Sequence, residues 1–317
     1  MSFEVKKARR EKQKLIAGLM GPSGSGKTLS ALLIAYGMMR EAYPQISEEE
    51  VWAKVGLADT EHKRSLLYFD YQIDDETKVG EFLHINFEPP YTTERYQEAI
   101  VALKQAGAEV IVIDSLSHNW QGEGGIVEQH GAMSGNSFQN WGKLAPETTK
   151  LVRTLTRNDV HIIATLRTKQ EYAMELNEKG KQQPVKIGTK PVQKDEMEYE
   201  FMLNFNVDMN HMAKASKDNT HLFGEEEFRI TVNDGRRLFR WLELGVDVKA
   251  EEAERRAKQA EADEKERQRL LAEILNAVEG NEKKQKELAG MEFKMNEQKV
   301  HDFNLKAMQR AHEILTN

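Results

Sequence analysis

Cysteine is absent from this chain of 317 residues, and long apolar runs are absent too. Without cysteine the chain can form neither disulfide bonds nor thiolate metal sites. No run is long enough to span a bilayer, and the charged first residues lack the apolar core of a signal peptide. We therefore expect a cytoplasmic protein that does not cross a membrane.

The chain also lacks an excess of positive charge, because 45 Lys and Arg residues stand against 52 Asp and Glu residues, for a formal net charge of -7 at pH 7. This total argues against a protein that coats DNA through bulk positive charge, although local basic patches remain compatible with it. The nine histidines show no metal-binding spacing such as HExxH, and no Ser/His/Asp arrangement stands out. We expect no structural or catalytic zinc.

Three glycines lie close together in GPSGSGKT (21–28), which directly follows the apolar run KLIAGLM and precedes a helical stretch. This pattern matches GxxxxGK[ST], in which backbone N–H groups and the helix N-terminus turn toward phosphate oxygens. Lys27 is expected to reach the β- and γ-phosphates and act in catalysis, and Thr28 to ligate Mg²⁺. The expected nucleotide-binding residues of this loop are Gly21, Pro22, Ser23, Gly24, Ser25, Gly26, Lys27 and Thr28.

Two apolar runs end in acids that such a loop requires. EVIVID supplies Asp114, which we expect to help hold Mg²⁺ because this ion prefers oxygen ligands. Ser115 follows it and is expected to contribute to nucleotide binding. The other run ends in LADTEH, where Asp59 and Glu61 are both candidates for the group that activates the attacking water. Spacing alone does not choose between them.

Apolar runs alternate with helical stretches, which predicts a mainly parallel α/β sheet flanked by helices. We expect a P-loop core over residues 15–246, with EFRITVNDGRRLFRWL (227–242) forming strands and hairpins. The basic segment 1–14 is either a solvated tail or an arm that contacts phosphate. The charged helical extension 247–317 either docks on the core or offers a surface for self-association or a partner protein.

The order GPSGSGKT, ADTEH and VIVIDS resembles RecA-type ATPases, and the chain is more closely similar to phage nucleotide-binding ATPases related to RecA. Stretches similar to that group include DTEHKRSLLY, DSLSHNWQGEGG and KPVQKDEMEYEF, within residues 13–225. The resemblance implies a RecA-like core, ATP with Mg²⁺, and Glu61 as the acid that activates water. It also implies work on DNA in recombination, annealing or replication, with Sak-type annealing ATPases among the relatives.

The resemblance further implies a homo-oligomer, since a neighbour's basic residue often completes the ATP site in RecA-like assemblies. Lys214 and Lys217 are the residues at the corresponding point, and we take Lys217 as the catalytic candidate. Relatives often show a lysine-x-arginine pattern here, whereas Asp218 and Asn219 follow Lys217 in this chain.

The run HIIATLR ends with Thr165 and Arg167 at the point where a polar sensor of the γ-phosphate would lie. Arg167 is therefore a catalytic candidate. The alternative is that Arg167 only pairs with an acid at the surface.

Two segments correspond to the DNA-facing loops of RecA-like proteins and predict contact with single-stranded DNA. Residues 117–141 either form a mobile loop with aromatic platforms for bases, or a folded cap with Trp120 and Trp141 in the core. Residues 169–194 form either a flexible basic loop that neutralises backbone phosphates or an ordinary solvated hairpin. The lysines of this second segment are Lys169, Lys179, Lys181, Lys186, Lys190 and Lys194.

Three functions compete on these grounds. The first is an ATP-hydrolysing, RecA-like protein that contacts single-stranded DNA. The second is an ATP-gated module that recruits a protein through the C-terminal helices. The third is a small-molecule kinase, which is disfavoured because kinases of that kind use an arginine-rich lid, whereas residues 169–194 are rich in lysine.

Overall fold

The structure is a computed structural model that describes residues 5, 7–75, 77–176, 182–195, 197–294 and 298–316. The chain divides into two compact units, residues 12–245 and residues 246–317 with 1–11. Among the helices of the described ranges, none combines the length and the apolar character needed to cross a membrane.

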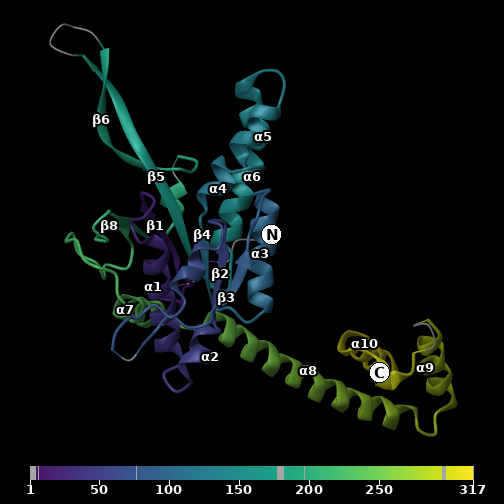
Figure 1. Cartoon of the computed structure of the whole chain (residues 1–317). Helices are drawn as coiled ribbons and strands as arrows, with labels where there is room; N and C mark the ends of the chain where they lie inside the picture. The colour runs from purple at the N-terminus through teal and green to yellow at the C-terminus, as the bar shows by residue number, and fades with distance from the viewer. Residues whose placement is uncertain are drawn as a thin grey trace. The chain divides into compact units, whose positions relative to one another are not determined.

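The larger unit is built on one central sheet (Figure 1). Its strands are parallel to their neighbours, except that β8 runs antiparallel to β7 at one edge and β6 pairs antiparallel with β5. The predicted α/β fold with a mainly parallel sheet is confirmed. The strands lie in the order β3 (Leu83–Asn86), β2 (Val55–Asp59), β4 (Val110–Asp114), β5 (His161–Leu176), β1 (Ile16–Gly21), β7 (Leu203–Val207) and β8 (Ala213–Asp218).

Helices cover both faces of this sheet, because the central strands are apolar on both sides. In β4, Val110 and Val112 belong to one core cluster, and Ile111 and Ile113 belong to the other. Alternate residues of a strand point to opposite faces, so an uninterrupted β-branched run needs a cover on each. The first face is covered by α1 (Lys27–Ala42), α2 (Glu48–Trp52) and α7 (Val232–Leu242), and the second by α3 (Thr93–Gln105) and α6 (Ser137–Thr156).

The expectation of strands and hairpins over residues 227–242 is wrong for most of this segment, because α7 occupies it. Thr231 and Asp234 form a capping box that starts the helix. A Cβ on Gly235 would lie 2.2 Å from the carbonyl oxygen of Ile34, so α7 and α1 pack with their backbones in close approach. This tertiary contact outweighs the β-branched character of the segment.

The carboxyl ends of β1, β2, β4 and β5 meet at one edge of the sheet, as parallel strands require. β5 continues beyond this edge and pairs with β6 (Gln182–Pro191) in a hairpin that projects from the sheet (Figure 1). Short helices follow β2 and β4 and precede β7. They are η1 (Arg64–Tyr68), α4 (Ser117–Gln121), α5 (Ile126–Ala132) and η2 (Met197–Glu200).

The smaller unit is helical and has a core of its own. It contains α8 (Val248–Val278), α9 (Glu282–Lys294), η3 (Val300–Asp302) and α10 (Leu305–Thr316). Near the end of α8, Leu270, Ile274 and Val278 are buried, whereas Leu275 is exposed. They pack with Phe303 and with residues of α10. In the basic N-terminal segment, Arg9 forms an ion pair with Glu251 of α8.

Candidate active site

A tight turn joins β1 to α1 and consists of the glycine-rich loop. Gly24 and Gly26 have φ angles of 85° and 89°, which residues with a side chain rarely adopt. A Cβ on Gly21 would lie 2.3 Å from the carbonyl oxygen of Val207, because β7 runs directly beside the loop. The loop backbone therefore follows a path that these glycines make possible.

Lys27 begins α1 and reaches back across the loop. Its Nζ atom donates to the carbonyl oxygens of Gly21, at 2.9 Å, and of Pro22, at 2.7 Å. Burial lowers the pKa of this ammonium, while the charges of Asp114 and Glu61 act in the opposite direction. A cation in this position, at the N-terminus of a helix of 16 residues, favours the binding of an anion.

Asp114 ends β4 beside the loop, where two threonine hydroxyls hold its carboxylate. Thr28 donates to Oδ2 at 2.6 Å, and Thr165 of β5 donates to Oδ1 at 2.5 Å. Burial raises the pKa of Asp114, and these two hydrogen bonds lower it. The predicted pair of magnesium ligands, Thr28 and Asp114, therefore lies together in the structure.

The two acids at the end of β2 point in different directions. Asp59 is fully buried, and its carboxylate accepts hydrogen bonds from the backbone N–H of Glu61, at 2.7 Å, and from the N–H and hydroxyl of Ser65. These bonds shape the turn after β2. The side chain of Glu61 instead lines the cavity in front of the glycine-rich loop. The geometry thus gives Asp59 a structural part and leaves Glu61 facing the cavity.

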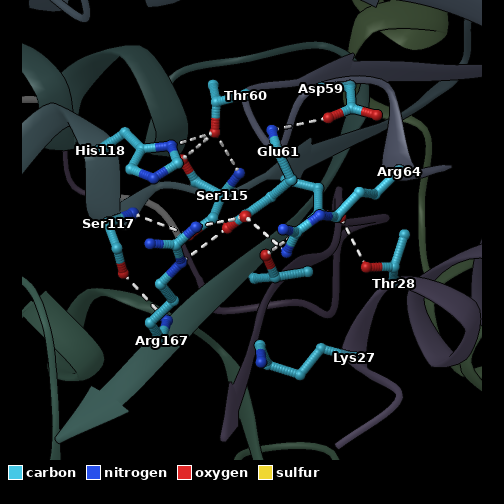
Figure 2. Close-up of polar contacts among 12 residues, drawn as sticks. Lys27, Thr28, Asp59, Thr60, Glu61, Arg64, Ser115, Ser117, His118 and Arg167 are labelled. Atoms are coloured by element: carbon cyan, nitrogen blue, oxygen red, sulfur yellow. Dashed lines mark hydrogen bonds and ion pairs between the residues drawn. The ribbon is translucent and has the colours of Figure 1, made fainter. Parts of the chain in front are cut away.

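Arg167 forms a two-pronged ion pair with Glu61 (Figure 2). Its Nε atom lies 2.7 Å from Oε1 of Glu61, and a second guanidinium nitrogen contacts Oε2. In the register of β1 and β5, Arg167 lies opposite Gly21, the first residue of the loop. Arg167 therefore pairs with an acid, but that acid is Glu61 in the cavity, and its part as a sensor of the γ-phosphate stays a prediction.

Ser115 was expected to bind nucleotide, but it is buried and is not among the described residues that line the cavity. Its N–H donates to the hydroxyl of Thr60 at 2.7 Å, and its own hydroxyl accepts from the N–H of Ser117. Ser115 therefore shapes the turn between β4 and α4.

The cavity has a volume of about 650 Å³, a size typical of small-molecule sites. Several of its residues were not foreseen from the sequence. Arg64 and Tyr68 lie on η1, three and seven residues after Glu61. This spacing, typical of one face of a helix, is the signal in the sequence that could have placed them beside Glu61. His211 and Arg229 come from distant segments and carried no local signal. The lining also includes Ser23, Gly24, Gly26, Lys27, Thr28, Asp114, Arg167 and Tyr71.

These residues fit a nucleoside triphosphate with Mg²⁺. The loop backbone adopts a conformation that a side chain at Gly21 would obstruct and that side chains at Gly24 or Gly26 would strain. The N-terminus of α1 follows directly after the loop. The hydroxyl of Thr28 and the carboxylate of Asp114 are the oxygen donors that Mg²⁺ prefers. Lys27, Arg64, Arg167 and Arg229 outnumber the acids Glu61 and Asp114 in the lining, which suits a polyanion.

A family model described as an AAA domain matches residues 13–227, which is more than half of the chain. The chain belongs to this family. AAA domains are P-loop ATPases that in general use ATP and Mg²⁺, so membership indicates nucleotide binding and hydrolysis. A comparison with curated proteins found no match.

Within the AAA domain, Lys217 lies away from the cavity. In the β7–β8 hairpin, Lys217 pairs with Asn204. The end of this hairpin nearest the glycine-rich loop is the pair of Val207 with Ala213. The Nζ atom of Lys217 donates to the carbonyl oxygen of Tyr199. The structure therefore does not bring Lys217 to the site of its own chain, and a role across a subunit boundary stays a prediction.

The first predicted DNA-facing segment is folded rather than an open loop, because α4, α5 and the start of α6 occupy it. Its tryptophans are not both in the core. Trp141 is 38% exposed and stacks between His130, at a ring-centroid distance of 4.0 Å, and Trp120, at 5.7 Å. Phe138, one turn earlier on α6, is 87% exposed. The segment thus presents an aromatic stack at the surface.

The second segment contains the projecting β5–β6 hairpin, so the hairpin alternative describes its backbone. Lys169 and Lys190 face each other as a register pair, and Lys190 also lies 3.7 Å from Glu171. Lys179 and Lys181 lie outside the described residues.

Proposed function

We propose that the chain is a RecA-like ATPase of phage origin that acts on DNA in the host cytoplasm, in recombination, annealing or replication. The observation that carries its ATPase part is the cavity in which Lys27, Thr28, Asp114, Glu61 and Arg167 meet at the carboxyl ends of parallel strands. This is where ligands bind in open α/β sheets.

The chemistry follows from the positions of the side chains. The loop N–H groups and Lys27 bind the phosphate tail, and Thr28 and Asp114 are placed to hold Mg²⁺, which when bound neutralises phosphate charge. Glu61 is the general base that orients and activates water. The guanidinium of Arg167 occupies both carboxylate oxygens of Glu61, so Arg167 must release Glu61 before that carboxylate can activate water. The terminal phosphate of ATP is the anion that would draw Arg167 away.

Contact with single-stranded DNA is supported by two features. The stack of Trp120, Trp141 and His130 offers an aromatic surface on which bases can stack. The β5–β6 hairpin and the bend that follows it carry Lys169, Lys186, Lys190 and Lys194 within the described residues. Side-by-side assembly, with Lys217 reaching a neighbour's site, belongs to the same proposal.

ATP turnover measured with and without single-stranded DNA, at low and high salt, tests this function. We expect turnover to rise with DNA and the rise to shrink at high salt, because phosphate contacts weaken as salt increases. Turnover that ignores DNA at both salt concentrations contradicts the DNA part and leaves the ATPase part standing. Turnover that requires a small phosphoryl acceptor would identify a kinase instead.

A second candidate function is an ATP-gated module that recruits another protein. The observation that favours it is the separate core of the smaller unit, formed by Leu270, Ile274, Phe303, Met308 and Leu315. Turnover that is indifferent to DNA, together with partner capture that depends on the bound nucleotide and on residues 247–317, would support this candidate.

A further inference from the structure

The first two residues of α4 contact both sides of the Glu61–Arg167 pair (Figure 2). The hydroxyl of Ser117 accepts a hydrogen bond from the backbone N–H of Arg167 at 2.9 Å. The ring Nδ1 atom of His118 lies 2.6 Å from the hydroxyl of Thr60, the residue immediately before Glu61. One short helix therefore contacts the backbone of Arg167 and the side chain of the residue before Glu61.

Thr60 is the junction of this arrangement. Its N–H donates to the carbonyl oxygen of Asp114 at 2.6 Å, and its hydroxyl accepts from the N–H of Ser115 at 2.7 Å. These bonds tie the end of β2 to the end of β4. The Thr60 hydroxyl also lies 3.2 Å from the carbonyl oxygen of Ser115. The contact with His118 is added to these bonds, and it is the one that comes from a side chain of α4.

His118 is suited to hold this contact without taking part in the reaction. Its ring stacks on Tyr91 at a centroid distance of 5.0 Å, and it is not among the described residues that line the cavity. Burial, and after it the charge of Arg167, lower the pKa of His118, while Glu61 raises it and His62 lowers it. A neutral ring can accept the hydroxyl proton of Thr60 or donate to its oxygen.

We propose that His118 is a positioning residue for ATP hydrolysis, which fixes the turn that aims Glu61 and carries any movement of α4 to the Glu61–Arg167 pair. The inference rests on the proposed ATPase function. It adds to that function a physical route from the aromatic segment to the cavity, because Trp120 lies two residues after His118 on the same helix.

Two pairs of variants test this role. His118→Phe keeps a ring that can stack on Tyr91 but removes the hydrogen bond, whereas His118→Asn keeps a polar atom near the place of Nδ1. Thr60→Val removes the hydroxyl at constant size, and Thr60→Ser keeps it. The measurements are the kcat for ATP, the Kd for a nucleotide analogue, and the thermal midpoint of unfolding.

We expect His118→Phe to lower kcat about tenfold or more, because a misplaced base is costly, while Kd changes less than about threefold. His118→Asn and Thr60→Ser should recover most of the loss. Thr60→Val also removes the hydrogen bond from the N–H of Ser115, so it can cost more than His118→Phe. Adding His118→Phe to Thr60→Val should lower kcat little further, since the contact between the two residues is already lost.

Wild-type kcat in His118→Phe would overturn the inference and leave the ATPase function intact. Equal loss in His118→Phe and His118→Asn, with weaker nucleotide binding and a lower unfolding midpoint, would also overturn it by showing a purely structural role. Absence of ATP turnover in the wild-type protein would overturn the proposed function and this inference together.

Discussion

The Nε atom of Arg167 lies 2.7 Å from Oε1 of Glu61, so a guanidinium of the cavity holds the carboxylate that is proposed to activate water. The pair joins β5, at the last residue that pairs with β1, to the turn after β2, and Ser117 of α4 holds the backbone of Arg167. Hydrolysis in this arrangement requires Arg167 and Glu61 to move apart.

Arg167→Ala should lower kcat about 100-fold, because the positive charge that would stabilise the terminal phosphate is lost. We expect this loss to outweigh the release of Glu61 from its ion pair. Nucleotide binding should weaken far less, since Lys27 and the loop remain. Arg64→Ala is the matched control, because Arg64 also lines the cavity but its side chain is 63% exposed and lies 4.0 Å from Glu61. A faster Arg167→Ala enzyme would show that Arg167 only restrains Glu61.

Glu61→Gln should retain nucleotide binding and lower kcat by about 100-fold or more, as expected for loss of a general base. Asp59→Asn should instead lower the thermal midpoint of unfolding, because the buried carboxylate accepts three hydrogen bonds within its own turn. Steady-state kinetics and thermal unfolding of both variants separate the two roles. Loss of hydrolysis in stable Asp59→Asn, with normal turnover in Glu61→Gln, would reverse the assignment.

Sequence alone could place the glycine-rich loop and Asp114, because a strand, a turn and a helix that are adjacent in the chain build most of that site. It could not separate Asp59 from Glu61 by spacing, since the two acids lie two residues apart and the choice depends on which one faces Ser65. Arg229 and His211 were missed for a related reason. They reach the cavity only after distant segments have packed.

The segment that forms α7 shows the same limit in the fold. The stretch EFRITV (227–232), which leads into α7, contains Phe228 and three β-branched residues, and Asp-Gly is a common hairpin turn, so local propensity favours strands. The helix forms because Gly235 packs against α1 and Leu238 and Leu242 enter the core. Such contacts are made between residues far apart in the chain, and no local pattern indicates them.

His161 should make the stability of the larger unit depend on pH. It is buried at the start of β5, and its Nδ1 atom accepts the N–H of Leu15 at 3.0 Å. Burial, assisted by the charge of Lys14, lowers its pKa to about 3. The neutral ring of His161 therefore makes its full contribution to the free energy of unfolding above the unfolded-state pKa, near 6.5. This free energy falls as the pH drops from 6.5 toward about 3.

At pH 5 this single group should cost about 2 kcal/mol relative to pH 7, because the unfolded state gains the proton first. Urea unfolding of the wild type and of His161→Asn, which keeps an acceptor but does not titrate in this range, measures the difference. The variant should lose less stability between pH 7 and pH 5. Identical pH profiles would show that His161 is not held neutral by the fold.

Trp141→Ala should weaken binding of single-stranded DNA about tenfold, because loss of one stacking ring costs roughly 1–3 kcal/mol. Turnover of ATP without DNA should stay close to that of the wild type, since Trp141 is not among the described residues of the cavity. Tyr199→Ala removes another ring, 68% exposed and on η2, and serves as the control. Equal affinity in Trp141→Ala and the wild type, measured by fluorescence anisotropy, would remove the aromatic stack from the DNA proposal.

The account stands on the ability of the glycine-rich loop to hold a triphosphate, and isothermal titration calorimetry of ATP in magnesium buffer measures this directly. The wild-type protein should bind ATP at one site per chain, and Lys27→Ala, with an unchanged fold by circular dichroism, should show no heat of binding. No heat from the wild-type protein, or equal heat from both proteins, would contradict the account.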